Sequence, residues 1–220
     1  AVAGHSFGEI TALHAAGVLD ETALLQVARR RGELMAAASA LPGAMTAVSA
    51  DVSRVGKILK DLDRTDVVIA NHNAPAQVVI SGAQAGIEAA EGLMQAESVR
   101  FKRLDVATAF HSPLVAASEA PFGEFLAGVT FAPGTTPVWS GESAALYESD
   151  ASAQQERLAR QIANPVRFVE LIEAMSASGI DTFVEVGPGS VLTHLVGQTL
   201  SERKHHAIPL VRRGKGGVTS

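Results

Sequence analysis

A serine near the start of the chain lies in a pattern typical of a catalytic nucleophile. The segment Gly4-His5-Ser6-Phe7-Gly8 fits G-x-S-x-G, the strand-to-helix turn that exposes a serine hydroxyl for attack. The flanking glycines allow a sharp turn without a Cβ clash, and the helix that follows would direct backbone N–H groups toward a developing oxyanion. The spacing therefore predicts a nucleophilic Ser6, with a plain turn serine as the alternative.

The base that would activate this serine must come from the seven histidines of the chain. His111 is favoured by its position, because it follows a strand and a segment of small residues and precedes Ser112-Pro113. Loops at the ends of strands are where rigid scaffolds place working groups. Other histidines are less suited, because they adjoin the serine, face away from it, pack on a helix or lie in a charged run: His5, His14, His194, His205 and His206.

An arginine on the apolar face of a predicted helix gives an independent indication of a site. At 100° per residue, Arg31 falls within the stripe formed by Val27, Ala28, Leu34 and Met35. An unpaired guanidinium among apolar side chains is costly, so it must reach an anion or a set of carbonyl groups. Two interpretations stay open, namely an ion pair with a buried acid and a two-pronged clamp for a substrate carboxylate.

The elements that must position these residues alternate between strands and helices. Residues 44–106 predict the order β-α-β-β-α-β, with strands at 45–50, 67–70, 78–81 and 98–106 and helices at 52–62 and 86–96. This order is typical of a ferredoxin-like unit. The flanking residues 1–43 and 107–210 predict strand-turn-helix units, with strands at 137–140 and 181–186, a turn at 187–189 and helices at 21–40, 113–127, 153–162 and 190–200.

We therefore expect an α/β protein with a discontinuous large domain, 1–43 and 107–210, built on a mainly parallel sheet. Residues 44–106 would form an inserted ferredoxin-like subdomain. Residues 211–220 have the composition of a linker or tail.

Composition narrows the classes of function. The 220 residues include 18 Lys+Arg, 23 Asp+Glu, 47% hydrophobic residues and no Cys. The absence of Cys excludes disulfides and thiolate zinc sites, and we expect no metal. A formal charge of −5 argues against a nucleic-acid partner. No apolar run approaches the roughly 20 residues needed to cross a bilayer, and no leader segment is visible. We expect a cytoplasmic protein that does not associate with membranes.

Taken together, the motifs resemble those of the malonyl-CoA:acyl carrier protein transacylases and of the acyltransferase domains of type I polyketide and fatty acid synthases. The resemblance implies an α/β-hydrolase-like large domain with a ferredoxin-like insert. The sequence motif at residues 4–9 is most similar to that of iterative synthases, including polyunsaturated fatty acid and enediyne types. The matching blocks follow the family order and span nearly the whole chain: GHSFGE at 4–9, RGELM at 31–35, NAPAQVVISG at 73–82, AFHS at 109–112, QIANPVRF at 161–168 and EVGPG at 185–189.

The resemblance also implies a role for each site residue. Ser6 would attack the thioester of malonyl-CoA, with His111 as its base and the N–H of Phe7 in the oxyanion hole. Arg31 would bind the free malonyl carboxylate, and Gln161 would help to line the pocket. The acyl group would pass to the phosphopantetheine thiol of an acyl carrier protein, with no permanently bound cofactor. Backbone carbonyls would orient the histidine, and neighbouring synthase domains are expected partners.

One segment of the family bears on substrate choice. Thr108-Ala109-Phe110-His111 resembles the His-Ala-Phe-His box associated with malonyl selection and departs from it at Thr108. Phe110 would crowd a substituted α-carbon, so we expect a preference for malonyl over methylmalonyl that is not absolute. The alternative is that Phe110 is only a core aromatic residue. His5, beside the nucleophile, is a further candidate for substrate contact.

The sequence departs from the family pattern in one respect, and two alternative functions stay open. The family has an N-terminal segment with a Gly-Gln-Gly motif, whereas this sequence starts at the serine turn, so we expect the sheet to lack strands and the oxyanion hole a wall. A serine hydrolase or thioesterase would use Ser6 with a late acid and base such as Asp181 and His205. A non-catalytic module would only dock a carrier protein.

Overall fold

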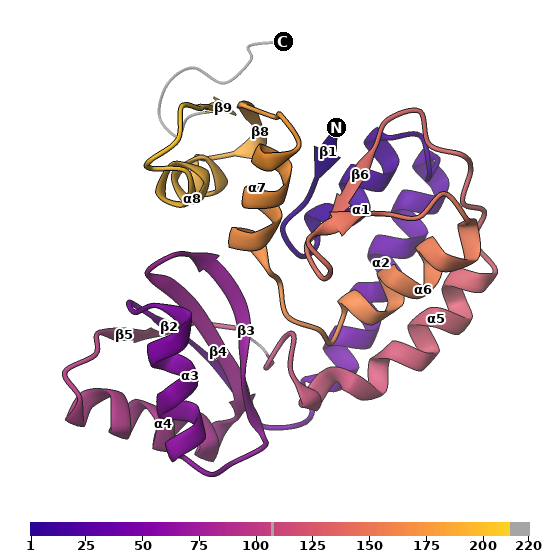
Figure 1. The fold of residues 1–220 in the computed structure, drawn as a ribbon. Helices are drawn as coiled ribbons and strands as arrows, with labels where there is room; N and C mark the ends of the chain where they lie inside the picture. The colour runs from indigo at the N-terminus through magenta and orange to yellow at the C-terminus, as the bar shows by residue number, and fades with distance from the viewer. Residues whose placement is uncertain (107, 212–220) are drawn as a thin grey trace.

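The computed structural model describes residues 1–106 and 108–211, and it begins with a strand, a sharp turn and two helices (Figure 1). The strand β1 (Val2–Ala3) leads into α1 (Gly8–Ala15), and α2 (Glu21–Ala38) follows. Asp20 caps α2, because its side chain accepts a hydrogen bond from the N–H of Ala23 at 2.7 Å. These elements carry the candidate serine and arginine, and both helices pack into one apolar core.

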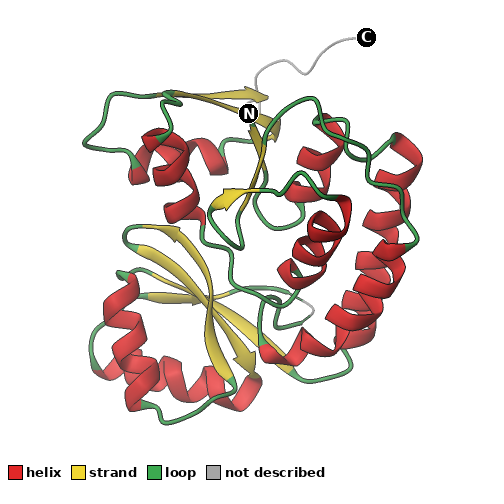
Figure 2. Ribbon diagram, turned by 45° about the vertical axis from the view of Figure 1, so that its right-hand side comes forward, coloured by secondary structure: helices red, strands yellow, loops and turns green. Residues whose placement is uncertain are grey.

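The middle of the chain forms a four-stranded antiparallel sheet. Its strand order is β3-β4-β2-β5, and α3 and α4 pack through apolar side chains on one face of it (Figure 2). The elements are β2 (Gly43–Val48), α3 (Val52–Asp61), β3 (Val67–Ala74), β4 (Gln77–Ala83), α4 (Gln84–Ala96) and β5 (Phe101–Arg103). The predicted order of strands and helices is found, but the predicted strand 98–106 is short, because this edge strand pairs with β2 over only three positions.

The remaining elements, between residues 113 and 211, complete the described fold. Two further small sheets are present in the described residues, with the orders β1-β6-β7 and β8-β9. The elements are the 3-10 helix η1 (Pro113–Ser118), α5 (Glu119–Ala127), β6 (Val138–Ser140), β7 (Ala145–Leu146), α6 (Ala151–Gln161), α7 (Phe168–Ala177), β8 (Thr182–Pro188), α8 (Val191–Thr199) and β9 (His206–Val211).

The mainly parallel sheet expected for the large domain is present in the described part of the chain as two separate parallel pairs. β1 pairs in parallel with β6, and β8 pairs in parallel with β9, but β1 and β8 belong to separate sheets. A groove of about 470 Å³ lies between them, lined by residues of β1, α1, β8 and α8. Within the described ranges no strand fills this groove, so the two parallel pairs are not joined.

The C-terminal boundary also differs from the expectation. β9 was not predicted, because the charged segment at 203–206 and Pro209 obscure the apolar pattern of this strand. It reaches Val211, the first residue of the expected tail, while 212–220 lie outside the described residues. The predicted turn at 187–189 is likewise partly strand, since β8 extends to Pro188.

Two backbone hydrogen bonds between β3 and Val166, here called the seam, join the four-stranded sheet to the rest of the described fold. The N–H of His72 donates to the carbonyl of Val166 at 2.9 Å, and the N–H of Val166 donates to the carbonyl of Ala70 at 2.8 Å. The segment around Val166 therefore continues the sheet beyond β3, directly beside the end of α6. Among the helices of the described ranges, none is both long and apolar enough to cross a bilayer.

Candidate active site

Ser6 lies at a strained turn between β1 and α1. Its φ of 51° is in the left-handed region, which non-glycine residues rarely adopt. Gly4 makes this turn possible, because a Cβ at this position would lie 2.0 Å from the backbone carbon of Gly8. Gly8 itself is not required on steric grounds, since a Cβ there would meet no described atom within 4 Å. The turn therefore depends on one of the two flanking glycines and presents the hydroxyl of Ser6 to its surroundings.

The hydroxyl of Ser6 contacts the ring of His111, 105 positions away in the sequence. The distance from Ser6 Oγ to His111 Nε2 is 2.7 Å. On the other side of the ring, Nδ1 lies 2.9 Å from the carbonyl oxygen of Asn164 and 3.2 Å from that of Gln161. Because carbonyl oxygens only accept, Nδ1 must carry the proton, and the lone pair of Nε2 faces the serine. This arrangement suits a general base, and its orienting groups are carbonyls.

The surroundings of His111 keep its ring neutral. The side chain is buried, and its φ of 54° is also in the left-handed region. Burial, together with the nearby positive charge of Arg31, lowers the pKa of His111 to about 4. The imidazole is therefore unprotonated at neutral pH and available to accept the serine proton.

Arg31 reaches the same site from α2. Its side chain is buried, and Nη2 lies 3.2 Å from Ser6 Oγ and 3.4 Å from the side-chain oxygen of Gln161. Its Nε is buried without a hydrogen-bond partner, and among the described residues no carboxylate forms an ion pair with it. Burial lowers the pKa of Arg31 from its ordinary value, yet a guanidinium stays charged in proteins. The site therefore holds a buried cation with free donor capacity beside the hydroxyl of Ser6.

Gln161, the last residue of α6, connects the three groups. Its side-chain Nε2 donates to the carbonyl of Ser6 at 2.7 Å, while its side-chain oxygen accepts from Arg31. Its own carbonyl accepts from His111. One buried residue thus fixes the serine backbone, the guanidinium and the imidazole relative to one another.

The other predicted site residues lie around this centre. Phe7 is the N-cap of α1, and its ring lies 5.8 Å from the guanidinium of Arg31. The N–H groups of the three residues after it donate to the carbonyls of residues 5–7. Phe110 is partly buried and packs against two apolar clusters, so the core interpretation has support as well. His5 Nε2 lies 2.7 Å from Asn73 Oδ1, and burial lowers the pKa of His5.

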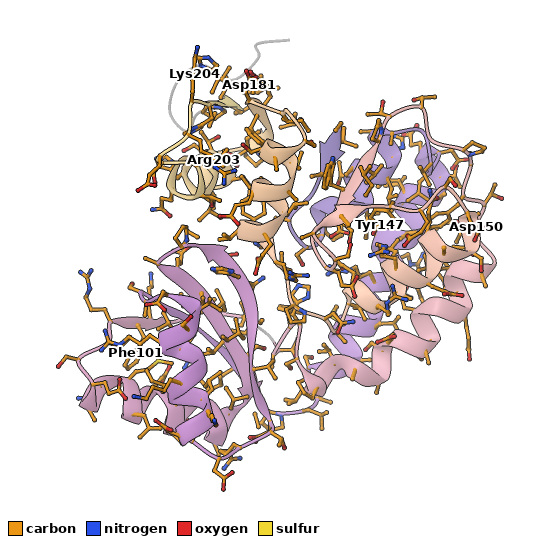
Figure 3. All side chains as sticks on the ribbon, viewed as in Figure 1. Phe101, Tyr147, Asp150, Asp181, Arg203 and Lys204 are labelled. Atoms are coloured by element: carbon orange, nitrogen blue, oxygen red, sulfur yellow. The ribbon has the colours of Figure 1, made fainter. Side chains whose placement is uncertain are left out.

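The residues of the rival hydrolase are engaged elsewhere. Asp181 accepts from the hydroxyl of Thr182, and His205 Nδ1 contacts the carbonyl of Arg203. Asp181 and Lys204 lie at one tip of the molecule (Figure 3). His14 and His194 also contact backbone carbonyls of their own segments. The groove between β1 and β8 is lined by His5 and Gly8, and Ser6 is not among its lining residues.

Sequence reasoning missed two members of the site. The carbonyl of Asn164 orients His111, and the side chain of Asn73 holds His5. Both residues lie in motifs with a family pattern, QIANPV and NAPAQ, and that location was the available signal. The residue type of Asn164 gave no further indication, because a backbone acceptor is common to every residue.

Comparisons with known proteins agree with this geometry. The family model of the acyl transferase domain matches residues 1–220. The chain is 41% identical over 198 residues to the polyketide biosynthesis malonyl CoA-acyl carrier protein transacylase PksC of Bacillus subtilis, covering 89% of this chain and 67% of that protein. It is 38% identical over 215 residues to the polyketide synthase GfsA of Streptomyces halstedii, covering 97% of this chain and 3% of the synthase.

A solved structure is similar over nearly the whole described fold. The malonyl-CoA:acyl carrier protein transacylase of Xanthomonas oryzae superposes with a TM-score of 0.90 at 34% identity, covering 96% of this chain and 68% of that one. The chain therefore spans about two thirds of the length of these transacylases and a small part of the synthase. With a family model that matches the whole sequence, this chain belongs to the acyl transferase domain family.

Proposed function

We propose that this chain transfers a malonyl group from malonyl-CoA, through an ester on Ser6, to the phosphopantetheine thiol of an acyl carrier protein. The observation that carries the proposal is the convergence of three side chains: the Ser6 hydroxyl lies 2.7 Å from His111 and 3.2 Å from the buried guanidinium of Arg31. A nucleophile with a base suits acyl transfer, and an unpaired buried cation suits an acyl group that carries its own carboxylate.

In the first step, Ser6 Oγ attacks the thioester carbon of malonyl-CoA while His111 Nε2 takes the hydroxyl proton. The carbon–sulfur bond breaks, and the proton passes from His111 to the sulfur of the departing CoA. Negative charge that develops on the carbonyl oxygen would be stabilised at the N-terminus of α1, where the N–H of Phe7 is the candidate donor. The products are a malonyl ester of Ser6 and free CoA.

In the second step, the phosphopantetheine thiol gives its proton to His111 as its sulfur attacks the ester carbon. The carbon–oxygen bond to Ser6 breaks, and the serine oxygen recovers the proton from His111. Water competes with the thiol for the ester, so the site must exclude it. The carbonyls of Gln161 and Asn164 hold the ring in one tautomer through both steps.

The charge of Arg31 links substrate binding to the strength of the base. Its positive charge is one of the causes that lower the pKa of His111. A malonyl carboxylate bound to Arg31 would offset that charge, and the pKa of His111 would then rise. An acetyl group brings no such charge and leaves the guanidinium uncompensated, so malonyl is favoured both in binding and in activation of the serine.

The test is acylation by labelled malonyl-CoA, read by intact mass. The expected result is one malonyl adduct on Ser6 that disappears in Ser6→Ala and in His111→Ala and remains in Ser39→Ala, which alters an exposed serine at the end of α2. No adduct, in a preparation that still binds a carrier protein, would favour the docking module. Full activity in His111→Ala with loss in His205→Ala would favour the hydrolase.

The finer organisation belongs to the same proposal. The antiparallel order β3-β4-β2-β5 with two helices on one face supports a ferredoxin-like insert at 44–106. The turn at Ser6 between β1 and α1 supports an α/β-hydrolase-like large domain formed by 1–43 and 107–210. The acyl carrier protein is the proposed partner, with neighbouring synthase domains where the chain is part of a synthase.

A further inference from the structure

A buried carboxyl group close to the nucleophile has no part in the reaction above. Glu9 lies in the first turn of α1, three residues after Ser6, and its side chain is fully buried. An ionisable group in such a place is costly unless hydrogen bonds compensate for the lost water. Its two oxygens must therefore have hydrogen-bond donors within the protein.

Each carboxyl oxygen of Glu9 accepts one short hydrogen bond from the same loop. The N–H of Gly141 donates to Oε1 and the hydroxyl of Tyr147 donates to Oε2, both at 2.6 Å. Gly141 allows this close approach, because a Cβ there would lie 3.1 Å from Glu9 Oε1. Tyr147 lies near α1 and α6 (Figure 3). Glu9 thus fastens the helix that carries the nucleophile to the loop at 141–148.

The same loop is fastened to the groups that orient His111. The carbonyl of Gly141 accepts from the N–H of Arg167 at 2.8 Å, close to Asn164 in the chain. The guanidinium of Arg157, on α6, lies 5.9 Å from the ring of Tyr147 and forms ion pairs with Glu142 and Glu148. α6 ends at Gln161. The loop therefore contacts both segments whose carbonyls hold the histidine ring.

We propose that Glu9 is a positioning residue: through Gly141 and Tyr147 it sets the distance between Ser6 on α1 and the segment 161–167 that holds His111. The inference rests on the proposed function only in the identity of the nucleophile and base. A 2.7 Å contact between Ser6 and His111 tolerates little displacement, because catalytic groups must stay within about 0.5 Å of their working geometry. A loosened α1 would lengthen this contact without removing any group that touches the substrate.

The charge state of Glu9 indicates which substitution should preserve its role. Burial raises the pKa of Glu9 to about 7, against the opposing effect of its hydrogen-bond donors. Burial therefore favours the neutral form of this carboxyl, so a neutral group of the same shape is a fair substitute. A glutamine can accept from Gly141 through its oxygen and donate to the hydroxyl oxygen of Tyr147 through its amide.

The experiment compares Glu9→Ala, Glu9→Gln and Tyr147→Phe with the parent chain. Two rates are measured: labelling of Ser6 by a fluorophosphonate, which needs only the serine and its base, and malonyl transfer, with kcat and KM determined separately. Melting temperatures are recorded for all variants. Val55→Ala is the stability control, because Val55 is fully buried in the core of the four-stranded sheet and contributes nothing to the site.

We expect Glu9→Ala to lower the labelling rate and kcat by about tenfold or more while KM changes little, since the lost contact only positions the reacting groups. Glu9→Gln should recover most of both rates, and Tyr147→Phe should fall between the two. Val55→Ala should lower the melting temperature and keep the parent rates. Unchanged labelling in Glu9→Ala, or no recovery in Glu9→Gln, would overturn the inference.

Two further outcomes are decisive. If Glu9→Ala does not fold, Tyr147→Phe still tests the inference, and a labelling rate equal to that of the parent would overturn it. A parent chain that reacts with the fluorophosphonate but not with malonyl-CoA would refute the proposed function, whereas the order of labelling rates would still decide the role of Glu9.

Discussion

Replacing Arg31 with alanine separates a substrate clamp from a structural cation. In the proposed complex, the buried guanidinium pairs with the malonyl carboxylate, and removing one partner of a buried pair costs about 3–5 kcal/mol. At about 1.4 kcal/mol for each factor of ten, the lower value corresponds to a loss of roughly 150-fold in kcat/KM for malonyl-CoA. Acetyl-CoA loses no contact, so its transfer should be unchanged or faster.

The assay is a panel of acyl-CoA thioesters with the early time course of Ser6 acylation read by intact mass. Arg29→Ala is the matched control, because Arg29 lies on the same helix, is largely exposed and pairs with Glu33. It should leave the ratio of malonyl to acetyl transfer unchanged. Equal loss of both substrates in Arg31→Ala would refute the clamp and show instead that the cation only holds the site together.

The same variant has a second consequence, in the pH profile. The positive charge of Arg31 is the second cause, after burial, of the low pKa of His111. Without that charge the pKa of His111 should rise above about 4, so the acid limb of the labelling rate should move to higher pH. A limb at the same pH in Arg31→Ala and in the parent would show that the charge of Arg31 does not set the basicity of the ring.

Three other outcomes follow from the site and its turn. In the parent chain, the rate of Ser6 labelling should persist down to about pH 4 and fall at lower pH as His111 becomes protonated. The pKa of His111 is below its ordinary value of 6.5, so the unfolded chain binds the proton more readily than the folded chain. The free energy of unfolding measured with urea should therefore also decrease as the pH falls from 6.5 toward 4. Phe110→Ser should improve methylmalonyl relative to malonyl transfer by about 10- to 100-fold in a competition assay, and an unchanged ratio would mean that Phe110 only packs in the core. Gly4→Ala should lower the melting temperature markedly, because its Cβ would lie 2.0 Å from Gly8, whereas Gly56→Ala in α3 meets nothing within 4 Å and should raise it.

The helices were the most predictable part of the fold. The expected helices at 21–40 and 153–162 end within two residues of α2 and α6 as observed. Their apolar stripes face the core, and both begin at an aspartate whose side chain caps the first turn. Arg31 is buried on α2 because it shares the face of Val27 and Met35.

The sheets were less predictable, because strand pairing depends on contacts distant in sequence. The alternating pattern of β8 does not indicate that its partner is β9. The sequence of β1 likewise does not indicate that it pairs with β6 and not with β8. β3 is longer than expected because its polar end, at 71–73, is supported by the seam with Val166. Apolar patterns alone do not indicate such support.

Within the site, motifs identify side chains better than they identify backbone acceptors. The serine pentapeptide indicates a nucleophile that needs a base, and the arginine on an apolar helix face indicates a cation that needs an anion. The backbone carbonyls of Gln161 and Asn164 set the tautomer of His111, but no residue type in the sequence indicates that they do so. Glu9 was likewise overlooked, because a glutamate in the first turn of a helix is ordinary and its burial depends on Tyr147, far along the chain.

The use of carbonyls at His111, where many serine enzymes use a carboxylate, has a consequence for the proposed reaction. Carbonyl dipoles fix the ring but carry no full negative charge, so burial and, after it, the nearby guanidinium lower the pKa of His111. In the proposed reaction the substrate would supply the missing charge, because a malonyl carboxylate on Arg31 would offset the cation at the moment when Ser6 must lose its proton. A neutral acyl group occupies the site without strengthening the base. Selection for malonyl would thereby act on the chemical step as well as on binding, and an aspartate in place of the carbonyls would remove that second level of discrimination.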